Sequence, residues 1–289
     1  QTKETIGLIG EAGSGKSAIV KGMLAVRDKT VDGFVSAGST GAVMAGGMFR
    51  LGRIKGIDRP ALAPLLPNGK DFFLLIDCGA NAECSVEYLV QFAYLGSFYA
   101  SRALGIEKPR VGLLNIGAED TKGDQLRIDT YKALREAGDA GHLNFIGNIE
   151  AKDAIKGGCD VLVADGFSGN VMLKTMEAGG SFVGKELKTM FKANPLTMLS
   201  AVFCKGGLNS FKAKMDPNKV GGTAILGISR PVIKAHGSSD AIAFKNAIRQ
   251  AIGIAEKDTI GLISERMAVY TEYRKERRKQ EKEREAAKV

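Results

Sequence analysis

The chain has 289 residues, which suits one large domain or two ordinary ones, and either can bury an extended core. Its 44% apolar and 25% charged residues are ordinary for a globular protein, while 37 glycines against 7 prolines favour many tight loops. The formal net charge of +9 favours anionic partners such as phosphorylated ligands, acidic proteins or anionic lipid surfaces. Without a run of 18 apolar residues or an Arg-led apolar start, neither a transmembrane helix nor a signal segment is expected.

Cysteine and histidine spacing argues against a metal site. The two histidines are far apart, and no C-x-x-C pair occurs among the cysteines Cys78, Cys84, Cys159 and Cys204. We therefore expect no metal and no cofactor. Free thiols in a large domain fit a cytoplasmic protein.

Short β-type apolar runs alternate with helical patterns along the chain. Strands are predicted at Thr5–Ile9, Val31–Val35, Phe72–Ile76, Val111–Leu114, Leu143–Ile146 and Asp160–Ala164. Helices are predicted at Ala18–Val26, Val86–Leu104, Gln125–Ala137 and Val171–Phe191. This alternation favours an α/β fold with a largely parallel sheet covered on both faces.

Five predicted strands run directly into a small polar residue and a glycine. The segments that follow them are Ser36–Gly41, Asp77–Asn81, Asn115–Asp120, Gly147–Glu150 and Asp165–Asn170. The carboxyl ends of parallel strands line one crevice, where such folds bind ligands, so we expect a site there. The alternative is that these loops use Gly, Asn and Asp only for their turn conformations.

The composition changes after Gly180. Lys185–Lys219 holds seven lysines among apolar residues, and Gly221–Gly227 then predicts another strand. A helix is predicted from about Ala241 to Glu256, and the charged segment Tyr270–Val289 is interpreted as a solvated helix or a frayed tail.

Near the start, Gly10–Ser17 matches the P-loop pattern between a strand-like and a helix-like run. In a P-loop, Lys16 would contact the terminal phosphates and Ser17 would hold magnesium, with Asp77 as a Walker-B candidate. Nucleotide binding is therefore the second hypothesis, and a non-catalytic scaffold is a third.

From about Val31 to Glu256 the chain resembles the bacterial phosphate acyltransferase family, the acyl-[acyl-carrier-protein]:phosphate transacylases of phospholipid synthesis. The resemblance is carried, in order, by SAGSTGAVMAGGMFRLGRIKGIDRPALAPLLP, LLIDCGAN, YLVQFAYLGSFYA, PRVGLLNIGAEDTKG, NFIGNIEAKD, DVLVADGFSGNVMLKT and RPVIKAHGSSD. It implies a three-layer α/β/α sandwich resembling the isocitrate and isopropylmalate dehydrogenases. It also implies a single acyltransferase domain over residues 1–269 with a helical insertion at 185–219 and a tail at 270–289. The family's usual N-terminal segment is expected to be truncated or divergent here.

The resemblance implies transfer of a long acyl chain from acyl carrier protein to inorganic phosphate, giving acyl phosphate. Since phosphate is itself a nucleophile, no covalent intermediate is needed, and the protein must orient the reactants and stabilise the oxyanion. Cys78 is accordingly read as a small core residue rather than a nucleophile. A homodimer and the downstream membrane glycerol-3-phosphate acyltransferase are implied as partners, and no nucleic acid is expected.

Candidate catalytic residues are Lys122 as a phosphate cation, His236 as a donor to the oxyanion or leaving thiolate, and Lys174 with Asn170 on one helix face. Each could instead be an ordinary surface or structural residue. Candidate substrate- or phosphate-binding residues are Ser39, Thr40, Gly41, Asn81, Asn115, Glu119, Asp120, Asn148, Asp165, Gly166 and Ser238.

The segment Asn194–Lys214 predicts peripheral contact with an anionic membrane surface. Its apolar residues can form one stripe on a helix beside several lysines, with Leu196, Leu199, Val202 and Phe203 as the contact residues. The alternative is that the same face packs against a second subunit.

Overall fold

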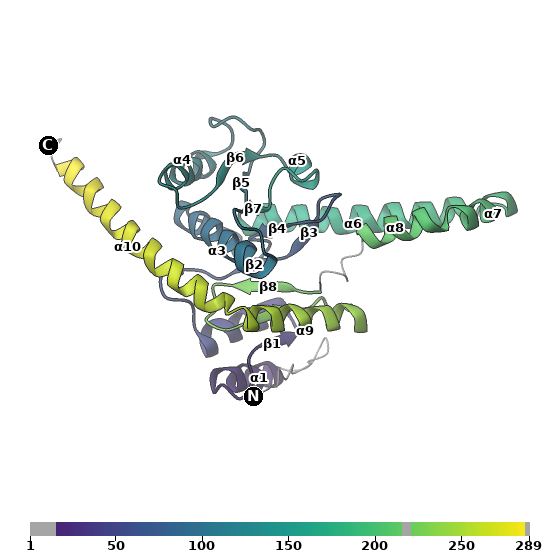
Figure 1. Ribbon diagram of the computed structural model, residues 1–289, viewed down its shortest axis with the longest axis horizontal. Helices are drawn as coiled ribbons and strands as arrows, with labels where there is room; N and C mark the ends of the chain where they lie inside the picture. Colours follow the sequence, from purple (N-terminus) through teal and green to yellow (C-terminus); the bar gives the residue numbers. More distant parts are fainter. Residues whose placement is uncertain (1–15, 216–220, 287–289) are drawn as a thin grey trace.

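The computed structural model describes residues 16–215 and 221–286, and within them the strands form two sheets (Figure 1). The four-stranded sheet has the order β1 (Phe34–Ser36), β9 (Val232–Lys234), β8 (Thr223–Leu226) and β2 (Ala61–Ala63). The five-stranded sheet has the order β3 (Leu65–Pro67), β4 (Phe72–Ile76), β7 (Val161–Val163), β5 (Val111–Leu114) and β6 (Phe145–Ile149).

The two sheets differ in strand direction. In the five-stranded sheet β4, β7, β5 and β6 are parallel, and only the edge strand β3 is antiparallel. In the four-stranded sheet only β1 and β9 are parallel, while β8 and β2 run antiparallel to their neighbours. The sequence pattern did not predict β2 or β3. Both are edge strands in a segment that contains Pro60, Pro64 and Pro67, which edge positions tolerate.

Helices follow most strands. They are α1 (Lys16–Arg27), α2 (Thr40–Gly46), the π-helix η1 (Gly47–Leu51), α3 (Val86–Leu104), α4 (Gln125–Asp139), α5 (Ala151–Ile155), α6 (Gly166–Phe191), α7 (Pro195–Phe203), α8 (Lys205–Met215), α9 (Ala241–Glu256) and α10 (Thr259–Ala286). Side chains of Ser85, Asp124, Asp165 and Asp240 cap α3, α4, α6 and α9 by accepting a backbone amide three residues ahead. The helix starts are thus set by local side-chain chemistry.

Two hydrophobic cores lie on the opposite faces of the sheets. In β4, Leu74 and Ile76 pack into the core formed with α3, α4, α9 and α10. Phe73 and Leu75 pack into the other core, which includes residues of α1, α2, α5 and α6. Since alternate strand residues point to opposite faces, the strands form a middle layer between two helical layers. The predicted α/β/α sandwich is confirmed.

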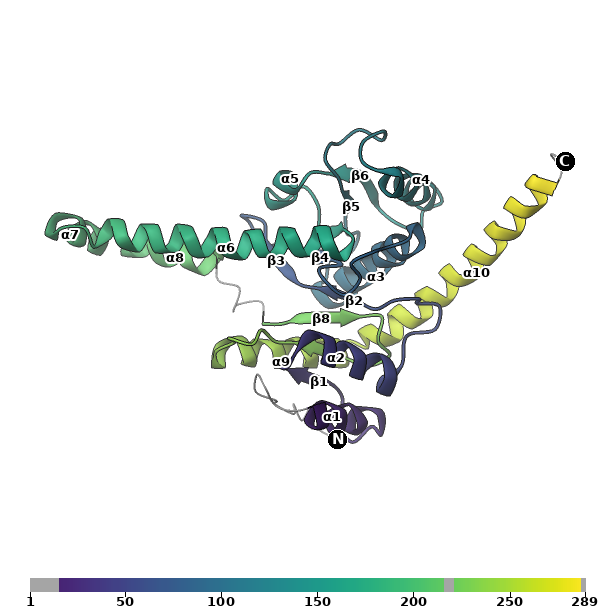
Figure 2. The same cartoon turned by 180° about the vertical axis from the view of Figure 1, so that it is seen from behind.

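Two long helical features project from this body (Figures 1 and 2). α6 extends away from the sheets, α7 lies at its far end and α8 folds back along it; we call these three helices the arm. α10 leaves in another direction after packing on α3. No helix in the described ranges is both long and apolar enough to cross a membrane.

Several strands and helices begin or end at residues other than those predicted from the sequence. The strand predicted at Val31–Val35 is β1 at Phe34–Ser36, because the chain turns around Asp32 and Gly33 first. Gly147 and Asn148, predicted to lie in a loop, belong to β6. The helix predicted from Val171 begins at Gly166, because Asp165 caps it. The predicted strand Thr5–Ile9 and the P-loop-like residues 10–15 lie outside the described residues.

Candidate active site

Asp77 directly follows β4, and its carboxylate holds the loop after β4 against β2 of the other sheet. Its carboxylate Oδ1 accepts the amides of Leu62 and Cys78 at 2.8 and 2.7 Å, and Oδ2 accepts the Asn81 amide at 2.7 Å. Burial raises the pKa of this carboxyl, although hydrogen bonds from Leu62, Asn81 and Ala80 oppose the shift. Asp77 is fully buried and satisfied by the protein, which suits loop organisation rather than a Walker-B role.

Glycines let the first turn of α6 sit directly on this loop. The Gly166 amide donates to the Asn81 carbonyl at 2.8 Å. A Cβ on Gly169 would lie 2.0 Å from the Asp77 carbonyl oxygen, and one on Gly166 would lie 2.5 Å from that of Asn81. The Asn170 side chain lies over the loop, with Oδ1 3.5 Å from an ideal Cβ on Gly79. The close approach therefore brings Asn170 to the carboxyl end of β4.

Asn81, a predicted ligand, is held within this loop. Its side-chain amide donates to the Pro60 carbonyl at 2.9 Å and to Asp77 Oδ2 at 3.1 Å. Asn81 therefore joins the segment before β2 to the loop after β4. Its side-chain amide is used to hold the backbone of these two segments in place.

Arg127, in the first turn of α4, is a site residue that the sequence analysis missed. Its guanidinium forms an ion pair with Asp165, donates to Ser168 Oγ at 3.1 Å and pairs with Asp124 at 2.8 Å. Asp165 also caps α6 by accepting the Ser168 amide at 2.9 Å. Predicted as a substrate residue, Asp165 thus ties α6 to α4. The spacing of Asp124 and Arg127 was the available signal, since residues three apart share a helix face.

Two buried asparagines shape the loop between β5 and α4. Asn115 Nδ2 donates to the Lys122 carbonyl at 3.0 Å, and Asn148 Nδ2 donates to the Glu119 carbonyl at 2.7 Å. The side chains of Glu119, Asp120 and Lys122 are exposed, and none of them forms an ion pair with another described residue. The asparagines therefore position the backbone and leave the Lys122 ammonium free.

Two lysines from different layers, Lys174 and Lys234, interact through their charges. Lys174 lies on α6, where its ammonium donates to Glu177 at 2.7 Å, and Lys234 ends β9. Burial lowers the pKa of Lys234, and the charge of Lys174 lowers it further. Burial raises the pKa of the Cys78 thiol, as does the charge of Asp77, so this thiol is poorly suited to be a nucleophile.

His236 follows β9 of the four-stranded sheet, two residues after Lys234. The Ser238 amide donates to His236 Nδ1 at 3.2 Å, and the Ser238 hydroxyl lies 2.7 Å from the same nitrogen. Because a backbone N–H can only donate, Nδ1 is the acceptor, and in the neutral ring Nε2 carries the proton. After the parallel strand β1, Ser39 caps α2, whose first residues are Thr40 and Gly41.

The predicted residues thus lie in the loops that follow the strands, in β6 and on the helices α2 and α6, with Lys122 beside the five-stranded sheet and His236 beside the four-stranded one. Their individual roles stay predictions. A cavity of about 400 Å³ lies elsewhere, at the amino ends of β5 and β6, and contains none of them.

Comparison with known proteins identifies the family. Residues 11–261 match the family model described as "Fatty acid synthesis protein". The phosphate acyltransferase of Thermoanaerobacter pseudethanolicus is 46% identical over 249 residues, covering 86% of this chain and 74% of that protein. That of Lysinibacillus sphaericus is 48% identical over 251 residues, covering 86% and 74%. The chain belongs to the phosphate acyltransferase family.

Solved structures share the fold. A phosphotransacetylase from Streptococcus pyogenes matches with a TM-score of 0.56 at 19% identity, over 84% of this chain and 68% of that one. A branched-chain phosphotransacylase from Enterococcus faecalis V583 matches with a TM-score of 0.51 at 15% identity, over 82% and 79%. Family membership makes this protein an acyltransferase enzyme, and the resemblance seen in the sequence is confirmed.

Proposed function

We propose that the enzyme transfers a long-chain acyl group from an acyl-carrier-protein thioester to inorganic phosphate. A phosphate oxygen attacks the thioester carbonyl carbon, the new C–O bond forms, and the C–S bond breaks. The products are acyl phosphate and the carrier-protein thiol, whose sulfur takes up one proton. No electrons are exchanged, so the chemistry needs orientation and charge stabilisation rather than a redox group.

The observation that best supports this proposal is that the chain belongs to the phosphate acyltransferase family. The lysines Lys174 and Lys234 add an electrostatic argument. The charge of Lys174 disfavours the charged form of the half-buried Lys234, so an anion bound near both ammonium groups would stabilise them. Phosphate carries the matching charge. Lys174 also lies near Cys78, which follows the end of β4 where the Asp77 loop and α6 meet.

The remaining candidate residues are assigned complementary roles. Lys122 contacts phosphate from the loop after β5, with Glu119 and Asp120 beside it. His236 donates its Nε2 proton to the oxyanion or the leaving sulfur, held in that tautomer by Ser238. Asn170 donates to the substrate from α6. Further phosphate and substrate contacts are assigned to Ser39, Thr40, Gly41, Gly166 and the backbone positioned by Asn81, Asn115, Asn148 and Asp165.

The test measures acyl phosphate formation from acyl-carrier-protein thioester and phosphate. Lys122→Ala should raise the KM for phosphate and His236→Ala should lower kcat, each by ~10²-fold if the group acts in the transition state. Lys245→Ala removes an exposed lysine of α9 and should behave as wild type. Near-normal kinetics in both active-site variants would place the chemistry elsewhere, and no acyl phosphate from the wild type would refute the reaction.

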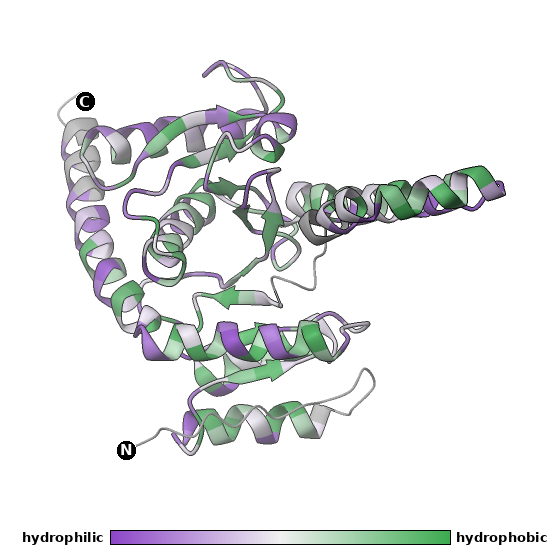
Figure 3. Ribbon diagram, turned by 45° about the vertical axis from the view of Figure 1, so that its right-hand side comes forward, coloured by the Kyte–Doolittle hydropathy of each residue, from purple (hydrophilic) through white to green (hydrophobic). Residues whose placement is uncertain are grey.

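We also propose that the tip of the arm contacts an anionic membrane surface. Asn194 and Thr197 form a capping box at the start of α7, and the contact residues of this helix point outward, with Leu196 76% and Phe203 83% exposed. The apolar colouring continues along the arm (Figure 3). Such a face gains free energy by insertion, and each nearby lysine contributes ~1 kcal/mol at an anionic surface. This would deliver a poorly soluble acyl phosphate to a membrane glycerol-3-phosphate acyltransferase.

The membrane proposal competes with a homodimer that covers the same face, which includes Leu199 and Val202. Wild type should sediment with anionic vesicles and be released at high salt, while a Leu199→Glu, Phe203→Glu variant should stay in the supernatant with an unchanged oligomeric state. If the variant sediments like wild type, or changes oligomeric state, the face is an interface or core element instead.

A further inference from the structure

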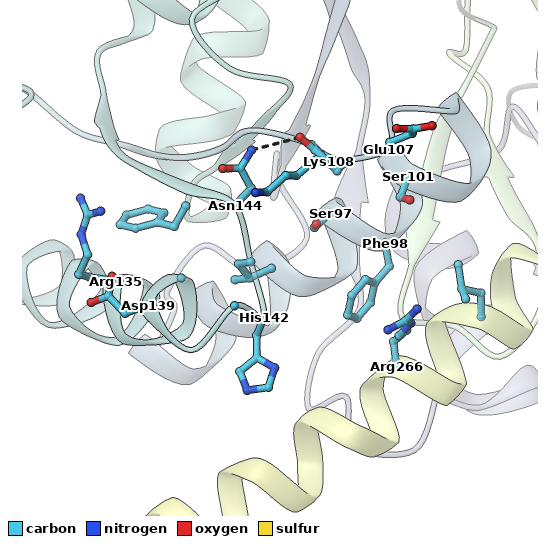
Figure 4. A pocket seen from close by; sticks show the side chains of 16 residues that line it. Ser97, Phe98, Ser101, Glu107, Lys108, Arg135, Asp139, His142, Asn144 and Arg266 are labelled. Carbon is cyan, nitrogen blue, oxygen red and sulfur yellow. Dashed lines mark hydrogen bonds between the residues drawn. The ribbon is translucent and has the colours of Figure 1, made fainter.

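The cavity at the amino ends of β5 and β6 lies between four segments of the chain (Figure 4). They are the C-terminal half of α3, the loop before β5, the end of α4 with the loop that follows, and α10. The volume of about 400 Å³ is within the range of small-molecule sites. β5 has four residues, about 13 Å, and these separate the cavity from Asn115 and the candidate active site.

Two serine hydroxyls of α3 line the cavity without a hydrogen-bond partner among the described residues. Ser97 and Ser101 are four residues apart, so they share one helix face, and Ser97 is only 8% exposed. Ser264 of α10, by contrast, satisfies its hydroxyl by donating to the Ile260 carbonyl at 2.8 Å. Both hydroxyls are therefore available to donate to an acceptor inside the cavity.

Cationic side chains surround the same space. Lys108 and Arg266 form no ion pair within the described part of the chain. Arg135 lies over the Phe145 ring, with Cζ 5.4 Å from the ring centroid. In Figure 4 the carboxylate Glu107 lies beside Ser101 and Asp139 beside Arg135, while Ser97 and Phe98 lie between Lys108 and Arg266. The lining holds the basic side chains of Lys108, Arg135 and Arg266 against the acidic ones of Glu107 and Asp139, and this excess of positive charge favours an anion.

Apolar side chains supply the rest of the lining. Phe98 and Leu262 face the cavity from α3 and α10, and Leu143 and Phe145 line it from the start of β6. A ligand bound in the cavity would contact hydroxyls and cations in one part of the lining and apolar side chains in another. That combination suits an oxyanion carried on a short apolar chain.

We propose that this cavity binds a small alkyl oxyanion, a phosphate monoester or a carboxylate, at a site separate from the candidate active site. The oxyanion accepts hydrogen bonds from Lys108, Arg266 and the Ser97 hydroxyl, and the alkyl chain lies along Phe98 and Leu262. The assignment does not depend on the proposed acyl-transfer reaction.

The test follows acetylation of Lys108 by an amine-reactive ester, read by peptide mass spectrometry on the full chain. Saturating hexyl phosphate or hexanoate should slow labelling of Lys108 by about ten-fold while the exposed Lys132 is labelled at its normal rate. Which of the two alkyl anions protects better identifies the head group. Because the readout is at Lys108, binding of the same probe in the candidate active site does not disturb it.

Arg266→Leu should need about ten-fold more ligand for the same protection, since a charge-assisted hydrogen bond is lost. Arg249→Leu, which removes an exposed guanidinium from α9, should retain wild-type protection. Should Arg266→Leu fail to fold, Ser97→Ala, which removes the hydroxyl assigned to the oxyanion, provides the same comparison. No protection by either alkyl anion, equal protection by hexanol or inorganic phosphate, or unchanged protection in the folded variant would overturn the proposal.

Discussion

Gly169→Ala tests how closely α6 must approach the loop after β4. The added Cβ would lie 2.0 Å from the Asp77 carbonyl oxygen and 3.3 Å from the Cα of Cys78. Both are backbone atoms, and real Cβ contacts essentially never fall under 3.0 Å, so helix and loop must separate by about 1 Å. Overpacking of this kind costs about 1–3 kcal/mol in the free energy of unfolding. A 1 Å displacement of Asn170 and Lys174 should also lower kcat/KM by about 10²-fold.

Gly179→Ala is the matched control, because it lies in the same helix and an added Cβ meets nothing within 4 Å. Alanine in an exposed helix interior should stabilise by about 0.5–1 kcal/mol without loss of activity. Denaturant unfolding gives the stability of both variants, and the acyl phosphate assay gives their kcat/KM. Wild-type stability and turnover in Gly169→Ala would refute the close-approach argument.

Three further predictions concern other parts of the fold. Cys78→Val should keep most activity, because the buried thiol is not a nucleophile; loss of turnover in a folded variant would contradict this. Although burial opposes the shift, hydrogen bonds from Arg110 lower the pKa of Asp160, so its stabilisation is present above pH ~4 and lost as pH falls. Acid titration should therefore show a shallower loss of stability in Asp160→Asn than in wild type. Gln91→Leu should cost about 2 kcal/mol, measured by denaturant unfolding, because it removes the buried acceptor of the Asp58 amide, and an unchanged midpoint would argue against that role.

The sequence by itself determined the α/β class and most of the longer helices. It also predicted where the candidate site lies. Apolar periodicity predicted α3 and α9 at the residues observed. Their first residues are set by caps, Ser85 and Asp240, which are local signals in the sequence. Each apolar strand that ended in a polar residue and a glycine predicted the edge where the site loops gather.

Only the tertiary structure decided which polar residues are structural and which remain free. Asn81, Asn115 and Asn148 are indistinguishable from ligands in the sequence, yet each amide is used to hold a loop backbone. Arg127 was missed because its partner Asp165 lies 38 residues away. Sequence patterns relate residues that are two to four positions apart. They therefore cannot identify contacts between residues that are distant along the chain and meet only through packing.

The tertiary structure alone also determined three other features: the strands β2 and β3, the cavity beside α10, and the Lys174–Lys234 pair. β2 and β3 are defined by pairing with β8 and β4, not by their own proline-containing segment. The cavity and the lysine pair each combine side chains from elements far apart along the chain, so the sequence contained their residues but not their proximity.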